Sequence, residues 1–160
     1  MIRLSLIGVR VEVPTNQPIV LLREDDGTRF LPIFIGSPEA TAIVYALQGL
    51  ATPRPLTPDL FKTVLDDLSV KLDRVEITKL HEGTFYAEIE LDRDGDKSRI
   101  SSRPSDAIAL ALRVGAPIFV EEPAARGSSS TRPGSNTTMV VEPRWKMPSS
   151  SPRAIGFGVA

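Results

Sequence analysis

Two short segments of the chain place an arginine, a hydroxyl and an acid in the same order. The first is Arg-Pro-Leu-Thr-Pro-Asp at 54–59, and the second is Arg-Pro-Ser-Asp at 103–106. In each segment Arg-Pro comes before the expected start of a helix, and the acid falls in the first turn. A guanidinium beside the free N–H groups of a helix start can bind phosphate together with them. The pattern therefore indicates a site for a phosphate-bearing ligand.

The acids near these starts are candidates for the chemistry at such a site. Asp59 and Asp106 follow the two arginines, and Glu39 follows Ser37-Pro38 at the expected start of another helix. Carboxylates in this position can hold a divalent cation or activate a water molecule. The three side chains are therefore the candidate metal ligands.

A structural explanation of the same segments stays open. Thr57 and Ser105 are suitable N-cap residues, and acids in a first turn complement the helix dipole. This explanation does not account for Arg54 and Arg103, because a cation ahead of a helix N-terminus is electrostatically disfavoured.

Composition narrows the range of chemistry. The chain has no cysteine and one histidine, His81, so it has no thiolate site, and a zinc site would need mostly carboxylates. His81 lies beside an expected turn, where a solvated side chain is the simpler interpretation. Asp94-Gly95 lacks the spacing of an EF-hand loop and instead predicts a hairpin turn.

Charge and apolar runs bear on partners and compartment. Residues 1–122 carry 14 basic and 19 acidic side chains, which argues against an extended basic surface for nucleic acid. Charges interrupt the N-terminal segment, and no 18 apolar residues run together, so neither a signal peptide nor a membrane span is expected. The expected compartment is the cytoplasm.

The two parts of the chain differ in composition. In residues 123–160, 16 of the 38 residues are Pro, Gly or Ser. Such a stretch buries too little apolar surface to offset the entropy of ordering. The sequence predicts one domain at 1–122 and a disordered tail at 123–160.

Hydrophobic periodicity predicts the elements of this domain. Helical patterns cover 37–49, 57–68 and 105–114, and strand patterns cover 2–13, 19–23, 29–35, 70–80, 85–91, 96–100 and 117–120. The alternation of apolar and polar residues along the first strand shifts by one position near Gly8, which predicts a β-bulge. The order βββ-αα-βββ-α-β has strands and helices in blocks, so we expect an α+β fold with a mostly antiparallel sheet and three helices.

The helices carry two further expectations. The second helix has an apolar stripe that we expect to be buried, made of Leu60, Phe61, Val64, Leu65 and Leu68. The first helix has a second apolar flank, Ala42, Tyr45 and Ala46, where a monomer would normally carry charges. This flank predicts contact with a neighbouring copy, and hence a homo-oligomer.

Four segments together resemble a known family. LPIFIGSPEATAI, RPLTPDL, FYAEIEL and SRPSDAIALALR, in this order and at these distances, are similar to the bifunctional nuclease domain. The resemblance covers about residues 1–121. It implies a compact α+β fold, association as a homo-oligomer, and activity on both RNA and DNA.

Two positions depart from the family pattern. Members usually carry histidine where this chain has Pro58, and an acid where it has Ser101. If either family residue transfers protons or binds metal, this copy is weakened.

The leading hypothesis is a nuclease with nucleic acid as substrate and Mg²⁺ or Mn²⁺ as the candidate cofactor. In this hypothesis Arg54 and Arg103 clamp phosphate, Asp59 and Asp106 hold metal or position water, and Thr57 and Ser105 contact the substrate; no membrane partner is expected. Two alternatives stay open. One is a non-catalytic anion- or nucleic-acid-binding regulatory module, and the other is a homo-oligomeric scaffold without ligand.

Overall fold

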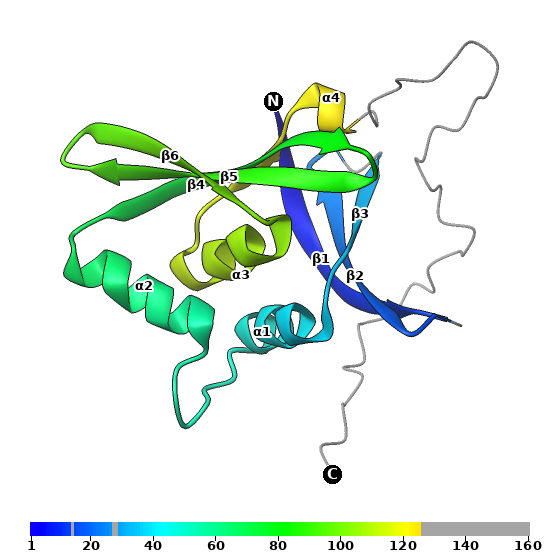
Figure 1. Ribbon diagram of the computed structural model, residues 1–160, viewed down its shortest axis with the longest axis horizontal. Helices are drawn as coiled ribbons and strands as arrows, with labels where there is room; N and C mark the ends of the chain where they lie inside the picture. Colours follow the sequence, from blue (N-terminus) through cyan, green and yellow to red (C-terminus); the bar gives the residue numbers. More distant parts are fainter. Residues whose placement is uncertain (14, 27–28, 126–160) are drawn as a thin grey trace.

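The computed structural model describes residues 1–13, 15–26 and 29–125 (Figure 1). Its strands are β1 (Ile2–Glu12), β2 (Gln17–Glu24), β3 (Phe30–Phe34), β4 (Lys71–His81), β5 (Thr84–Arg93), β6 (Asp96–Ser102) and β7 (Ile118–Val120). Its helices are α1 (Ser37–Gln48), α2 (Thr57–Asp67), α3 (Pro104–Val114) and α4 (Glu122–Ala125). The predicted α+β class and element order are confirmed.

The helix count is the one difference in this order. In the described part of the chain, α4 follows β7 as a fourth helix, where three were expected. A four-residue helix is too short to show a 3.6-residue period, so hydrophobic periodicity could not predict it. Its amides at Ala124 and Ala125 both bond to the carbonyl of Glu121, at 3.0 Å. Of the predicted tail, residues 126–160 lie outside the described residues.

The seven strands form one sheet in the order β3-β2-β1-β7-β4-β5-β6. Each pair of neighbours is antiparallel except β4 and β7, which are parallel. The sheet is therefore mostly antiparallel, as expected. The short β7 joins two three-stranded meanders, and α1, α2 and α3 lie together on one side of it (Figure 1).

Two local predictions in the strands are confirmed. The pairing of β1 with β2 shifts register between Leu6 and Gly8, and Gly8 has φ of +151°. A bulge at a glycine allows this conformation without a Cβ penalty. Asp94 and Gly95 both have positive φ, at 54° and 88°, as the type I′ turn between β5 and β6 requires.

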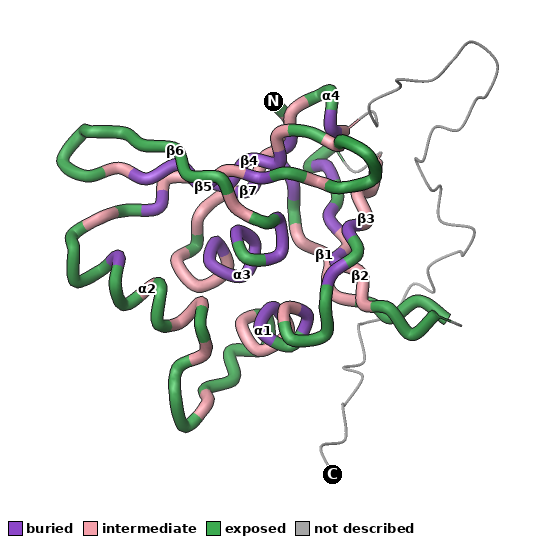
Figure 2. The backbone as a smooth tube through the Cα atoms, viewed as in Figure 1, coloured by how far each residue is buried: buried purple, intermediate pink, exposed green. Residues whose placement is uncertain are grey.

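The core surrounds α3, which contacts α1, α2, β4 and β5. Every residue from Ala107 to Ala111 is buried, and Ile108 is fully covered (Figure 2). A helix that is apolar nearly all round fits only such a central position. The buried centre of the domain is therefore α3, the helix whose N-cap is Arg103.

The prediction of a buried stripe on α2 is wrong for most of its residues. Leu65 is buried, but four other members, Leu60, Phe61, Val64 and Leu68, are between 41% and 55% exposed. The reason is that α2 packs mainly against α3 and makes few contacts with the sheet (Figure 2). On α1, Ala42 is buried inside the domain, so the expected flank does not face outward as a unit. Self-association itself stays a prediction.

Candidate functional site

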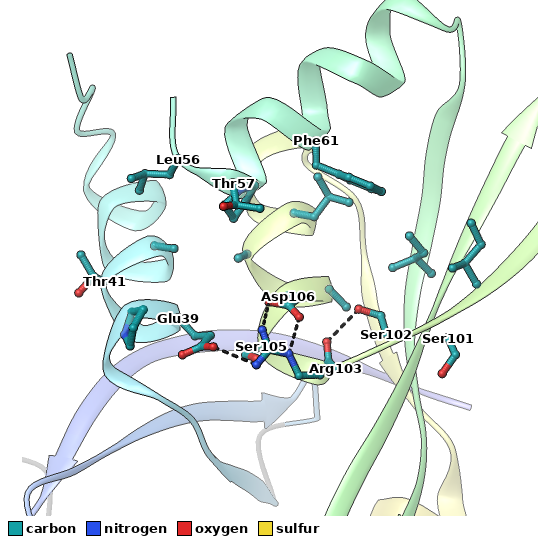
Figure 3. A pocket seen from close by; sticks show the side chains of 18 residues that line it. Glu39, Thr41, Leu56, Thr57, Phe61, Ser101, Ser102, Arg103, Ser105 and Asp106 are labelled. Carbon is teal, nitrogen blue, oxygen red and sulfur yellow. Dashed lines mark hydrogen bonds and ion pairs between the residues drawn. The ribbon is translucent and has the colours of Figure 1, made fainter. Parts of the chain in front are cut away.

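A pocket of about 730 Å³ lies between the starts of α1, α2 and α3 and the strands β5 and β6 (Figure 3). Its apolar walls include Leu56, Phe61, Ile89, Ile100 and Leu110. Its charged groups, Glu39, Arg103 and Asp106, gather at one end. Pockets of this size and character commonly bind small ligands through apolar walls and a few convergent polar groups.

Arg103 is the only cationic side chain among the described residues that line this pocket. Its Nε and Nη2 donate to the two oxygens of Asp106, at 2.7 and 3.0 Å, and its Nη1 donates to Oε1 of Glu39 at 3.0 Å. The hydrogen bonds that Arg103 donates to Asp106, and the negative charge of Asp106, are the main reasons why the pKa of Arg103 is raised. The guanidinium therefore stays cationic, and 66% of the side chain is accessible to a ligand.

Local structure explains this geometry. Arg103 is the N-cap of α3 and Asp106 is its third helical residue, so the acid lies directly beneath the arginine. Glu39 occupies the corresponding place in α1, whose N-cap is Gly36. A Cβ at Gly36 would lie 2.3 Å from Oε2 of Glu39, so the glycine leaves room for this carboxylate.

The predicted N-caps Thr57 and Ser105 are wrong by one and two positions. The N-caps are Leu56 and Arg103, and neither makes a side-chain cap hydrogen bond. Pro104 is the first residue of α3 and Pro58 the second of α2, positions where the missing N–H of proline costs no intrahelical hydrogen bond. Both hydroxyl residues line the pocket instead, where they can contact a ligand.

Asp59 is used for structure rather than for the pocket. Its Oδ2 accepts from the N–H of Leu56 at 2.8 Å, and its Oδ1 accepts from Nε of Arg113. Arg113 is only 7% exposed, and its other nitrogens donate to the carbonyls of Ala109 and Ala42, at 2.8 and 3.1 Å. Arg113 thus joins α1, α2 and α3, which form three sides of the pocket.

The environment of Asp59 changes its pKa. Desolvation is the largest single influence and would raise the pKa, but three effects outweigh it. They are the hydrogen bond from Arg113, the hydrogen bond from Leu56 and the charge of Arg113. The pKa of Asp59 is therefore held below its ordinary value.

The structure separates the predicted site residues into two groups. Arg103, Asp106, Glu39, Thr57 and Ser105 line the pocket, whereas Arg54 and Asp59 do not. Arg54 is exposed, so the two arginines do not clamp one ligand in this structure.

Sequence reasoning missed two residues that shape the site. Arg113 is the last residue of the motif SRPSDAIALALR, and a lone charge in the last turn of an apolar helix was the available signal. Phe61 was assigned to the core because it falls on the apolar stripe of α2.

The two departures from the family pattern come together in space. Pro58 on α2 and Ser101 on β6 both line the pocket, although 43 positions separate them in the sequence. Figure 3 shows Ser101 on β6, on the far side of Ser102 from the group formed by Arg103, Asp106 and Glu39. In the described residues, no group of three or more His, Cys, Asp or Glu side chains is placed to hold a metal ion. None of the helices in the described ranges is long and apolar enough to cross a membrane.

Comparison with known proteins identifies relatives. The chain is 52% identical over 117 residues to an uncharacterised protein of Mycobacterium tuberculosis, covering 73% of this chain and 70% of that protein. It is 32% identical to Bifunctional nuclease 2 of Arabidopsis thaliana and 30% identical to Bifunctional nuclease 2 of rice, Oryza sativa subsp. japonica. These two matches cover 67% and 71% of this chain, but only 33% and 36% of the plant proteins. The chain thus spans about a third of the length of each plant relative.

The sequence model of the Bifunctional nuclease domain matches residues 20–130. This range includes the starts of α1, α2 and α3, and with them the charged end of the pocket. The chain therefore belongs to the bifunctional nuclease domain family.

Proposed function

We propose that the protein hydrolyses phosphodiester bonds of RNA or DNA in the pocket, and that it does so slowly. The observation that carries this proposal is the exposed side chain of Arg103, whose guanidinium is held by Asp106 and Glu39 at the pocket's charged end. Membership of the bifunctional nuclease domain family supports the reaction class. The positions of Pro58 and Ser101 support the low rate.

Each polar side chain has a role that follows from its contacts. Arg103 binds the substrate phosphate through the second N–H of Nη1 and of Nη2, which its bonds to Glu39 and Asp106 leave over. Asp106 is a positioning residue, since both its oxygens bond to Arg103. Glu39 gives only one oxygen to Arg103, so it is the better candidate to accept a proton from an attacking water. The hydroxyls of Thr57 and Ser105 are further donors to the substrate.

The fit of a divalent metal can be judged from the same carboxylates. Asp59 is bonded to Arg113, and both oxygens of Asp106 are bonded to Arg103, so Glu39 is the pocket acid with an oxygen left for a metal ion. Mg²⁺ is commonly held by one or two carboxylates together with substrate phosphate oxygens. We therefore assign Mg²⁺ or Mn²⁺ to Glu39 together with substrate phosphate oxygens, only when substrate is present, and as the alternative to its role as proton acceptor. When bound, such an ion would stabilise the negative charge that develops on the phosphate.

The low rate follows from the residues at the two departure positions. General acid–base catalysis typically contributes about 10²–10⁴-fold, and it needs a group that can exchange a proton near the working pH. Proline has no such group, and a serine hydroxyl lacks the negative charge of a metal-binding carboxylate. His81 does not line the pocket and does not replace them.

The same observations favour a second candidate function. A pocket that keeps Arg103 but has Pro58 where the family usually has histidine suits a regulatory module that binds an anion or nucleic acid without cleaving it. The two functions differ in turnover and not in binding, so one assay separates them.

The test is a cleavage assay on single-stranded RNA and DNA with Mg²⁺, Mn²⁺ or EDTA. Slow cleavage that is lost in Arg103→Ala and kept in Arg54→Ala supports the nuclease. Arg54→Ala is a matched control because Arg54 also lies in an Arg-Pro segment but outside the pocket. Binding without cleavage in every buffer would replace the nuclease by the regulatory module. Equal loss in the two variants would contradict the placement of the site.

We also infer that the chain associates with copies of itself, through the exposed apolar side of α2. Leu60, Val64 and Leu68 are each more than 40% exposed there, which is unusual for large apolar side chains on one helix. Sedimentation equilibrium at micromolar concentration should show species larger than the 17.4 kDa chain. Leu60→Glu with Leu68→Glu should reduce them, and a single 17.4 kDa species in the unmodified protein would contradict the inference.

A further inference from the structure

A second hollow, of about 250 Å³, adjoins the pocket. It lies between the end of β3, the start of α1 and the turn between β4 and β5. The two cavities share three lining residues, Glu39, Arg103 and Ser105. The ion pair between Arg103 and Glu39 is therefore the boundary at which the two cavities meet.

Each cavity has one exposed phenylalanine in its lining. Phe61 of α2 lines the larger cavity and is 41% exposed, and Phe34 of β3 lines the smaller one and is 44% exposed. Figure 3 shows Phe61 at the end of the larger cavity away from Arg103. Aromatic rings beside a cationic group are the usual components of single-strand binding, since every base can stack on a ring.

The two carboxylates beside Arg103 limit the binding free energy that a phosphate alone can gain at this boundary. Arg103 is flanked by two carboxylates, so a bound phosphate meets one cation and two anions. Binding must therefore draw most of its free energy from apolar and stacking contacts on either side. A ligand that uses both cavities needs a phosphate in the middle and an aromatic or apolar group at each end.

We propose that the two cavities form one groove for a dinucleotide segment, with its phosphate on Arg103 and its two bases against Phe61 and Phe34. This inference rests on the proposed function, and it assigns the residues that hold the nucleotides flanking the phosphate. The apolar walls accept any base, so the groove recognises the dinucleotide unit rather than a sequence.

The test is a set of calorimetric titrations of the full chain in Mg²⁺ buffer. The probes are a thymidine dinucleotide with a phosphorothioate linkage, which resists hydrolysis, and inorganic phosphate. Stacking contributes about 1–3 kcal/mol per base, so Phe34→Ala and Phe61→Ala should each weaken dinucleotide binding about 5- to 150-fold. Neither variant should change the affinity for phosphate. Arg103→Ala should weaken the binding of both probes.

A matched control and a conservative variant make the test specific. Tyr86→Ala removes an aromatic residue of similar exposure that lines neither cavity, so it should leave both affinities within about twofold of the unmodified protein. Phe34→Leu keeps an apolar side chain and should retain the fold while losing most of the stacking. Thermal unfolding of each variant identifies any loss that comes from the fold.

The salt dependence gives an independent measure. With Arg103 as the one phosphate contact, log affinity should fall with a slope of about −0.7 against log salt. Between 50 and 200 mM salt this is about a threefold loss.

Three results would overturn the groove. They are no dinucleotide binding by the unmodified protein, no effect of either phenylalanine variant, or an effect of only one. Because the readout is binding, failure of the nuclease proposal appears separately: the phenylalanine variants would weaken dinucleotide binding while the cleavage assay showed no turnover.

Discussion

At the start of α3, Arg103 bonds to the acid three residues ahead and reaches Glu39 of α1 at the charged end of the pocket. At the start of α2, which carries almost the same residue types, Arg54 is exposed outside the pocket and Asp59 bonds to the distant Arg113. At the start of α3 the arginine lines the pocket, whereas at the start of α2 the acid forms an ion pair that joins two helices.

The difference comes from two extra residues. In α3 the arginine is the N-cap, so its side chain lies over the first turn, beside Asp106. In α2 the N-cap is Leu56, and Arg54 lies two residues before it. The guanidinium of Arg54 is thus displaced from the first turn, and Asp59 is left for another cation. Similar motifs predict similar chemistry only when their positions relative to the N-cap agree.

The largest effect is expected from restoring the family residues, one beside each helix start. Pro58→His with Ser101→Asp should raise cleavage by about 10²-fold or more, because it supplies a proton-transfer group and a carboxylate. Binding of the non-hydrolysable dinucleotide should change much less. Pro58→Ala with Ser101→Ala is the control. If the unmodified protein already cleaves as fast as the double variant, neither position takes part in the chemistry.

The next largest effect is a difference in stability between replacing Arg113, in the last turn of α3, and replacing Arg103, its N-cap. Arg113→Met leaves the carboxylate of Asp59 and two backbone carbonyls without their donor, so it should destabilise the fold by about 3 kcal/mol. Arg103→Met removes an ion pair that is mostly exposed, and it should cost less than about 1 kcal/mol. Urea unfolding of both variants measures the difference. Equal losses of stability would remove the distinction between a structural and a ligand-facing arginine.

Asp106 and Asp59 should also differ in whether their replacement affects ligand binding or stability. Asp106→Asn loosens Arg103 and should lower cleavage or dinucleotide binding about tenfold, with little loss of stability, because hydrogen bonds to charged groups contribute about 1.5–3 kcal/mol. Asp59→Asn should instead lower the unfolding midpoint and leave the affinity of the folded protein almost unchanged. The comparison fails if Asp59→Asn reduces binding as much as Asp106→Asn does.

The smallest expected effect is in the dependence of stability on pH. Folding lowers the pKa of Asp59, so its carboxylate stabilises the folded state at pH values above its unfolded pKa of about 3.9. This stabilisation is lost as the pH falls through the lower pKa of the folded state. The difference in unfolding free energy between the unmodified protein and Asp59→Asn should be constant from pH 5 to 7 and shrink below about pH 4. Glu90 and Asp73 also have lowered pKa values, but they titrate in both proteins and cancel in the difference. A difference independent of pH would argue against the pairing with Arg113.

The sequence by itself determined the element order, the bulge at Gly8, the turn at Asp94-Gly95 and the burial of the helix at 105–114. Each of these depends on residues next to one another. Periodicity sets which face of an element is apolar, a glycine permits a positive φ, and a run without polar residues must be buried. It also indicated Arg103, Asp106 and Glu39 as candidate site residues, but together with Arg54 and Asp59, which do not line the pocket.

Tertiary structure alone decided how the remaining parts meet. It placed β7 between β1 and β4, and it brought Pro58 and Ser101 into one pocket. It also left most of the apolar stripe of α2 exposed and paired Asp59 with Arg113, 54 positions away. A helical stripe shows that a face is apolar, but the packing of its neighbours decides whether the face is covered. An acid shows that a charge is present, and only the three-dimensional path of the chain decides which cation it reaches.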